Sequence, residues 1–318
     1  MAAFALYGCE QEPIVPSFWL RDVVHAHEQF IVVGSSHDQE SVHAMLLTSN
    51  DGRHWQSVSL DRRTTLNGVA HGDGRTVVVG GNEHEGDTRS LVLVSTDGAT
   101  WEPTFNPPGE ALDSIAFGNG LFVAASNRFV YASADGGTNW TKSDDLRFEW
   151  TPSVHFAAGQ FFLTNRDLAF STSTDGLTWT HHQAREGFGL SFVGDDGGQV
   201  VGLFEDDDCT DVDGCSTPPG GVAHSDDGVT WSEDVLQVGA PPTGFAATVD
   251  TAAMSTRSGI YVQTPAGWTL APPTFDGDGG SDAYYAITAS SSTLVAVGDR
   301  IAVSSGGAWE IIDPPRAR

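Results

Sequence analysis

The chain has 318 residues, with 42 acidic and 15 basic side chains, so its formal net charge is −27 and its pI is near 4.4. This charge disfavours binding to a nucleic acid backbone or to an anionic membrane surface, because both need a basic face on the protein. The length suits one large domain, and no apolar stretch is long enough to cross a membrane as a helix.

The N-terminal segment contains a candidate lipidation site. Cys9 follows Leu6-Tyr7-Gly8, a pattern that resembles the lipobox of bacterial lipoproteins, in which the cysteine is lipidated and becomes the mature N-terminus. Only eight residues precede Cys9, without a basic segment or a long hydrophobic stretch, so a chance match is the alternative. We expect residues 1–15 to form an N-terminal tail.

A short box that ends in tryptophan recurs along the rest of the chain. Five copies match closely, at residues 49–55, 95–101, 133–140, 173–179 and 225–231. Two altered copies follow at residues 264–268 and 304–309. The seven tryptophans follow one another at intervals of 37 to 52 residues, which is the period of a four-stranded propeller blade.

Each repeated unit reads as four short strands, a to d, joined by tight turns. In the third unit the apolar runs 114–117, 121–125 and 129–132 precede the box, and the tryptophan opens the fourth strand. Such runs of β-branched and aromatic residues between Gly, Asn and Asp are typical of hairpins, and no segment has a sustained helical period. The sequence predicts an all-β, seven-bladed propeller of four-stranded antiparallel blades over residues 16–312, followed by a tail at 313–318.

The box residues have structural roles that need no ligand. In Ser95-Thr96-Asp97-Gly98-Ala99-Thr100-Trp101 the aspartate can accept hydrogen bonds from backbone N–H groups of its own turn. The glycine supplies a positive φ, and the tryptophan is suited to fill the wedge between adjacent blades. Because the first and last units each contain all four strands, we expect the ring to close by side-by-side packing. The alternative is that residues 14–18 add a strand to the last blade.

The box resembles the Asp-box, or bacterial neuraminidase repeat, of sialidases, xyloglucanases, sortilin-type receptors and a photosystem II assembly factor. The resemblance implies the propeller fold, but the family includes hydrolases, receptors and assembly factors. Sialidases use a tyrosine nucleophile, a Glu, an Asp and three arginines, and have six blades. Here Phe18-Trp19-Leu20-Arg21 retains only the arginine of their Phe/Tyr-Arg-Ile/Leu-Pro motif, and Tyr284 or Tyr285, beside Asp282, is the candidate nucleophile.

Ten of the fourteen arginines fall on one predicted face of the ring, in b–c turns or on d–a connections. Guanidinium groups bind carboxylate, sulfate or phosphate through paired hydrogen bonds, so this face is the candidate anion-binding surface. The alternative is that each arginine pairs with a neighbouring carboxylate. The candidate ligand-binding residues are Arg21, Arg89, Arg128, Arg166, Arg257 and Arg300.

Two groups of loops are candidates for metal binding. The b–c loops of the first two units contain His37, Asp38, Glu40, His43, Glu83, His84, Glu85 and Asp87, which suit a transition metal or form solvated loops. The insertion at residues 205–220 contains Asp207, Asp208, Asp211 and Asp213, which suit calcium or form an acidic surface loop. Cys209 and Cys215 in this insertion are spaced to form a disulfide, which implies an oxidising, extracytoplasmic compartment.

Two functions remain open from the sequence. We expect an exported binding or assembly propeller, lipid-anchored if Cys9 is lipidated. It needs no cofactor, is a monomer, and holds a protein or an anionic glycan on its b–c/d–a face. The alternative is a glycoside hydrolase or lyase that acts on an acidic glycan, with its acids among Asp113, Glu149, Glu186 and Asp282. No local catalytic motif favours the alternative.

Overall fold

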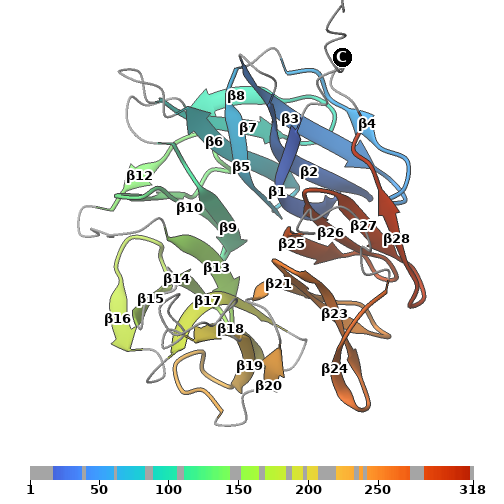
Figure 1. Cartoon of the computed structure of the whole chain (residues 1–318). Helices are drawn as coiled ribbons and strands as arrows, with labels where there is room; N and C mark the ends of the chain where they lie inside the picture. The colour runs from blue at the N-terminus through green and yellow to red at the C-terminus, as the bar shows by residue number, and fades with distance from the viewer. Residues whose placement is uncertain are drawn as a thin grey trace, which may run out of the picture.

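Seven four-stranded antiparallel sheets are arranged as the blades of a propeller, with the first blade beside the last (Figure 1). The computed structural model describes residues 17–37, 41–60, 63–82, 89–105, 111–143, 152–164, 169–183, 188–195, 199–206, 220–232, 236–238, 242–272 and 283–315. The expected fold class, the number of blades and the antiparallel pairing are confirmed.

Each blade consists of four consecutive strands, so the chain completes one blade before it begins the next. Blade 1 contains β1 (Ser17–Ala26), β2 (Gln29–His37), β3 (Val42–Ser49) and β4 (Gln56–Ser57). Blade 2 contains β5 (Thr65–Gly72), β6 (Arg75–Asn82), β7 (Arg89–Ser95) and β8 (Glu102–Phe105). Blade 3 contains β9 (Ser114–Gly118), β10 (Leu121–Ala125), β11 (Val130–Ser133) and β12 (Thr141–Lys142).

The other four blades repeat this arrangement. Blade 4 contains β13 (Ser153–Ala157), β14 (Gln160–Thr164), β15 (Ala169–Ser173) and β16 (Thr180–Gln183). Blade 5 contains β17 (Phe188–Asp195), β18 (Val200–Asp206), β19 (Gly220–Ser225) and β20 (Leu236–Val238). Blade 6 contains β21 (Pro242–Ala247), β22 (Ala252–Thr256), β23 (Gly259–Thr264) and β24 (Gly267–Leu270), and blade 7 contains β25 (Tyr284–Ala289), β26 (Leu294–Gly298), β27 (Ile301–Ser304) and β28 (Trp309–Ile312).

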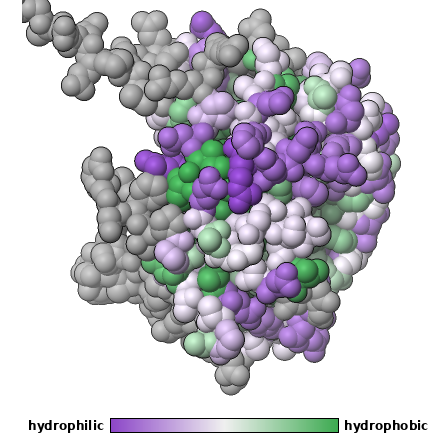
Figure 2. Space-filling view, turned by 90° about the vertical axis from the view of Figure 1, so that its right-hand side faces the viewer, coloured by the Kyte–Doolittle hydropathy of each residue, from purple (hydrophilic) through white to green (hydrophobic). Residues whose placement is uncertain are grey.

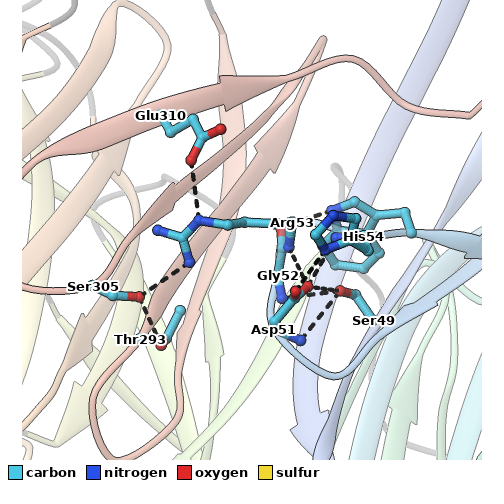
Figure 3. A network of polar contacts seen from close by, with 9 residues as sticks. Ser49, Asp51, Gly52, Arg53, His54, Thr293, Ser305 and Glu310 are labelled. Atoms are coloured by element: carbon cyan, nitrogen blue, oxygen red, sulfur yellow. Dashed lines mark hydrogen bonds and ion pairs between the residues drawn. The ribbon is translucent and has the colours of Figure 1, made fainter.

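The boxes form compact turns between the third and fourth strands. In the first box the Ser49 hydroxyl donates to Asp51 Oδ1 at 3.1 Å and accepts the Gly52 backbone N–H at 2.9 Å (Figure 3). The same aspartate oxygen accepts the backbone N–H groups of Arg53 and His54, both at 2.8 Å. These bonds satisfy the backbone of the turn without any ligand, as the sequence predicts.

Each closely matching box also rests on the blade that precedes it in the ring. A Cβ placed on Gly52 would lie 2.9 Å from Val295 and 3.0 Å from Val303, both in blade 7. Gly137 meets Val77 and Val94 of blade 2 in the same way. These glycines therefore combine a positive φ with a close approach that leaves no room for a side chain.

The hydrophobic core is divided into seven clusters, and each cluster joins two adjacent blades. Every box tryptophan contacts the cluster between its own blade and the preceding one; Trp140, for example, lies against Phe105 of blade 2 and is hydrogen-bonded to the Gly137 carbonyl oxygen at 3.1 Å. The predicted wedge role of the tryptophans is therefore confirmed. The indole N–H groups of Trp101 and Trp231 have no hydrogen-bond partner among the described residues.

The ring closes by packing between blades 7 and 1, as the sequence predicts. Phe30 and Val32 of blade 1 share a cluster with Val295 and Val303 of blade 7. At the outer edge of this junction Arg53 donates to Glu310 Oε2 at 3.0 Å and to the Ser305 hydroxyl at 3.4 Å (Figure 3). No described residue adds a fifth strand to blade 7. Residues 14–16 lie outside the described residues, and Phe18 belongs to β1.

We predict that Trp140→Ala lowers the free energy of unfolding by about 3 kcal/mol, because it removes a large aromatic side chain from the junction of blades 2 and 3. Chemical denaturation of the full-length protein measures this change. Trp19→Ala is the matched control, because Trp19 is 45% exposed and belongs to none of the seven clusters. Equal losses for the two variants would contradict the wedge role.

Candidate functional site

The two faces of the ring carry different loops. Because the strands of each blade are antiparallel, the hairpin between its first and second strands lies on the same side as its box. We call this side the box face. The turns between second and third strands, and the connections between blades, lie on the opposite side, which we call the loop face. We take the loop face as the candidate site. The turns of the box face are needed for folding, whereas the loops of the opposite face do not contain the box and can carry binding residues.

Three of the predicted ligand-binding arginines are exposed in turns of the loop face. Arg128, Arg257 and Arg300 lie between the second and third strands of blades 3, 6 and 7. The turn of Arg257 is shaped by Thr256, whose hydroxyl donates to the Gly259 carbonyl oxygen at 2.9 Å. Such a hydroxyl-capped turn leaves the central side chains exposed.

The structure describes the other three predicted arginines to different extents. Arg21 is exposed on β1, the innermost strand of blade 1. Arg89 begins β7 next to the corresponding turn of blade 2, and its side chain is outside the described part of the structure. Arg166 lies outside the described residues.

The inner strands of five blades carry a β-bulge near the loop face. A bulge leaves one residue without a partner in the ladder and redirects its side chain. Glycines face these bulges on the second strand: at Gly34, Gly80 and Gly298 a Cβ would collide with a carbonyl oxygen of the inner strand or of the residue just before it. The bulged residues are Arg21, Asn67, Ser191, Thr243 and Tyr285.

Three of the bulged residues tie their blade to the next one. The Thr243 hydroxyl donates to the Tyr284 carbonyl oxygen at 2.6 Å, and the Asn67 amide donates to the Leu112 carbonyl oxygen at 3.0 Å. The described residues place such a bond at six of the seven blade junctions; the other four pairs are Asp22–Val69, Ser114–Val154, Thr164–Ser191 and Ser191–Pro242. At the seventh junction, between blades 7 and 1, the bulged residues are Tyr285 and Arg21.

At the seventh junction we group five side chains as the seam cluster: Trp19, Arg21 and His37, which are in contact, and Tyr285 and Arg257, which are linked to them by the effect of the Arg21 and Arg257 charges on the Tyr285 phenol. The rings of Trp19 and His37 are 4.5 Å apart, and the Arg21 guanidinium carbon lies 5.6 Å from the Trp19 ring centroid. His37 is held by the Ser35 hydroxyl, 2.9 Å from its Nε2. Trp19 and Tyr285 are 45% and 37% exposed, so both rings are open to a ligand.

Electrostatic effects connect the seam cluster across blades 6, 7 and 1. Burial and the Asp299 carboxylate raise the pKa of Tyr285, while the charges of Arg257 and Arg21 lower it by less. The Tyr285 phenol is therefore protonated at neutral pH and can donate a hydrogen bond. Burial and the Arg21 charge lower the pKa of His37, which is consequently neutral at pH 7. The fixed positive charges of the cluster are those of Arg21 and Arg257.

These two guanidinium groups have no carboxylate partner among the described residues. Asp22 does not pair with Arg21; its two oxygens accept the backbone N–H groups of Val23 at 2.8 Å and Val69 at 2.9 Å. The arginines of the other described turns are engaged, since Arg300 lies 4.0 Å from Asp313 and Arg128 interacts with other groups. The expected pairing of arginines with neighbouring acids thus fails at Arg21.

The catalytic candidates of the sequence do not assemble in the described part of the structure. Tyr284 is buried in the cluster between blades 6 and 7, and the raised pKa of Tyr285 disfavours the phenolate that a nucleophile needs. The Asp113 carboxylate lies 3.5 Å from the Asn67 amide nitrogen. The other acids, Glu149, Glu186 and Asp282, lie outside the described residues.

The metal and cysteine predictions fall largely outside the described residues. This applies to Asp38, Glu40, Glu83, His84, Glu85 and Asp87, to Asp207, Asp208, Asp211 and Asp213, and to Cys9, Cys209 and Cys215. His37 and His43 are described, and the His37 ring lies against Trp19 in a tilted contact. Within the described ranges no three His, Cys, Asp or Glu side chains are placed to hold a metal ion.

The remaining surface gives two further observations. No helix in the described residues is long and apolar enough to span a membrane. On the side of the rim that carries β28 and β24, hydrophobic residues form small patches separated by hydrophilic ones (Figure 2). This view therefore shows no broad apolar area for a partner.

Comparisons with known proteins identify the fold alone. No protein-family model matches the chain, and no curated protein matches it. Among solved structures, "YCF48 bound to D1 peptide" has a TM-score of 0.64 at 16% identity and covers 96% of this chain and 97% of that one. The extracellular domain of the one-component system BT4673 from B. thetaiotaomicron has a TM-score of 0.60 at 10% identity, and the match covers 96% of this chain and 38% of that one. The WD40 propeller of Doa1 has a TM-score of 0.57 at 12% identity, and the match covers 93% of this chain and 94% of that one.

We predict that Asp22 makes the fold less stable as the pH rises from about 4 to about 7. In the unfolded chain the Asp22 carboxyl ionises at its ordinary pKa of 3.8, whereas burial raises its pKa in the folded state to about 7. Between these two values the unfolded chain is ionised and the folded state is still protonated, so the folded state loses stability as the pH rises. Relative to Asp22→Asn, which stays neutral, the wild type should lose at most about 1.4 kcal/mol per pH unit over this interval. Denaturant titrations of both proteins at several pH values measure the difference, and parallel pH profiles would contradict it.

Proposed function

We propose that this protein is a non-enzymatic binding or assembly propeller that holds a protein partner on its loop face. The observation that carries the proposal is the seam cluster, where Arg21 and Arg257 lie without carboxylate partners among the described residues of a chain with a net charge of −27. In such a chain most guanidinium groups have an acid within reach. Arg21, which lies over the exposed Trp19 ring, and Arg257, whose charge acts on the exposed Tyr285, are therefore suited to an external ligand.

Two features favour a binding role over catalysis. The described residues of the site do not include the catalytic groups of a glycosidase, and Tyr285 is protonated. A glycosidase needs two acidic groups across the scissile bond or an activated tyrosine. The seam cluster instead contains a protonated phenol beside Asp299, while Arg21 and Arg257 supply the positive charge. This set of donors binds an anion and has no group prepared to attack a glycosidic bond.

Two similar structures support a binding role in general terms. The YCF48 propeller is recorded with a D1 peptide, and the BT4673 propeller belongs to the extracellular part of a putative one-component system. Identities of 16% and 10% carry only the fold to this chain. The protein partner and the loop face are therefore part of our proposal, and their support comes from the seam cluster.

Export and calcium binding are also part of the proposal, and both rest on the sequence. A disulfide between Cys209 and Cys215 requires an oxidising compartment, and lipidation at Cys9 would anchor the protein to a membrane from outside the cytoplasm. The aspartates of residues 205–220 are suited to calcium. Mass spectrometry of the protein purified from its host tests both cysteine assignments.

We predict that a partner captured from the host's cell envelope depends on the seam cluster. Immobilised wild type and the double variant Arg21→Gln, Arg257→Gln are incubated with the same extract, and retained proteins are quantified by mass spectrometry. Arg53→Gln is the matched control, because it removes an arginine of the box face that bonds only within the protein. A true partner should fall by about tenfold with the double variant and stay unchanged with the control.

Equal retention by all three proteins would show that the loop face is not the binding surface. The alternative of an acidic-glycan hydrolase is tested in parallel by incubation with acidic polysaccharides and measurement of new reducing ends. Turnover that is lost with the double variant would replace the binding proposal by the enzymatic one.

A further inference from the structure

Two histidines join blades 1 and 2 on the box face. His27 lies in the turn between β1 and β2, and His71 lies near the end of β5. The hydroxyl oxygen of Thr76, on β6, is 3.1 Å from His27 Nε2 and 2.9 Å from His71 Nδ1. The two rings meet edge to face, with their centroids 4.8 Å apart. We call these three side chains the histidine bridge.

The turn that carries His27 has an unusual backbone. His27 and Glu28 both have a positive φ, of 52° and 60°. Two successive left-handed residues in a hairpin favour a sequence such as Asn-Gly, and the second position is a glycine in the matching turns of blades 2, 3 and 4, at Gly74, Gly120 and Gly159. A strained turn of this kind persists where surrounding contacts hold it. The bond between His27 and Thr76 is one of these contacts.

The histidine bridge also lies against the second box. A Cβ placed on Gly98 would collide with the Gln29 amide and lie 3.4 Å from the His27 ring. Thr76, at the other end of the contact, is fully buried. The bridge therefore joins the hairpin of blade 1 to the inside of blade 2, directly beside the box that packs the two blades together.

The histidine bridge can hold one added proton but not two. A hydroxyl group donates one hydrogen bond and accepts up to two. When at least one ring is neutral, the Thr76 hydroxyl donates to that ring and accepts an N–H from the other. When both rings are protonated, both can only donate. The buried Thr76 O–H then has no acceptor among the described residues, and two positive rings face each other.

No described carboxylate is placed to neutralise the second charge. Among the described residues, no ion pair involves His27 or His71. Burial lowers the pKa of His71, and the charge of His27 lowers it further. The charged groups of the surrounding elements are engaged elsewhere: Glu28 acts on His25, Asp73 points towards Gly120 of blade 3, Arg75 lies against Gly136 of the third box, and Asp97 accepts N–H groups of its own turn.

We propose that the histidine bridge is a proton-sensitive joint, which holds blades 1 and 2 together at neutral pH and loosens when its second imidazole is protonated. In the unfolded chain both histidines take up a proton independently below about pH 6.5, whereas the folded bridge accepts only the first without loss. The stabilisation is therefore complete above this pH and is lost as the pH falls below it. The bridge lies on the face opposite the seam cluster, so it does not depend on the proposed function.

The test compares the full-length wild type with the double variant His27→Asn, His71→Gln in denaturant titrations at about pH 7.5 and about pH 5. Both replacements stay neutral, and asparagine tolerates the left-handed turn. The folding equilibrium constant of the wild type should fall by about tenfold more than that of the double variant between the two pH values. Asp22, whose raised pKa also lies in this range, is present in both proteins, so its contribution cancels.

His181→Gln is the matched control. It removes an exposed histidine of β16 whose hydrogen bond, to Ser171, lies within its own blade, so the pH dependence should stay within about threefold of the wild type. If the double variant does not fold, either single substitution gives the same comparison, because one histidine carries no second charge. Parallel pH profiles of the wild type and the bridge variants would overturn the proposal.

An NMR titration of the imidazole signals tests the coupling of the two rings directly. His27→Asn should raise the pKa of His71, because it removes a neighbouring positive charge. The same titration of His181→Gln should leave the pKa of His71 unchanged. An equal pKa of His71 in the wild type and in His27→Asn would show that the rings do not compete for protons, and it would overturn the proposal even if the stability of the two proteins differed.

Discussion

The junction between neighbouring blades is the contact on which this structure depends. A single four-stranded blade cannot bury both of its faces, so each blade must share its apolar residues with two others. The box makes this contact repeatable: its serine and aspartate satisfy the turn, its glycine lies against the preceding blade, and its tryptophan fills the space between the two sheets. The ring therefore closes at blades 7 and 1 by the same packing, with Arg53 and Glu310 at its outer edge.

Repetition at the box face leaves the loop face free to vary. Bulges on the inner strands of five blades turn one side chain out of the ladder, and three of these blades use that side chain to bond to the next blade. At the closing junction the two bulged residues, Arg21 and Tyr285, are instead available to a ligand. The seam cluster is thus formed where the first and last blades meet, from residues that are far apart in the sequence.

The two faces also differ in charge. On the box face, hydrogen bonds from backbone N–H groups hold the pKa of Asp97, Asp175 and Asp227 below its ordinary value, so these carboxylates stay ionised in mild acid. Most of their acceptor capacity is used within the turn. On the loop face, Arg21 presents its positive charge beside the exposed Trp19 ring, and Arg257 is exposed in a turn.

The box spacing was sufficient to predict the number of blades, the antiparallel strands and the wedge role of the tryptophans, because these follow from local periodicity and turn chemistry. It also placed Arg21 and Arg257 on the loop face. The sequence did not show that Asp22 accepts the Val69 N–H and therefore does not pair with Arg21. Nor did it show that Trp19 and Tyr285 belong to the same cluster as the two arginines. Glycines such as Gly34, which lie opposite a bulge, were the sequence signal from which the bulges could have been predicted. Which side chains meet at the seam was decided only by the tertiary structure, because a bulge changes the direction of a side chain and ring closure brings together residues that no local pattern relates.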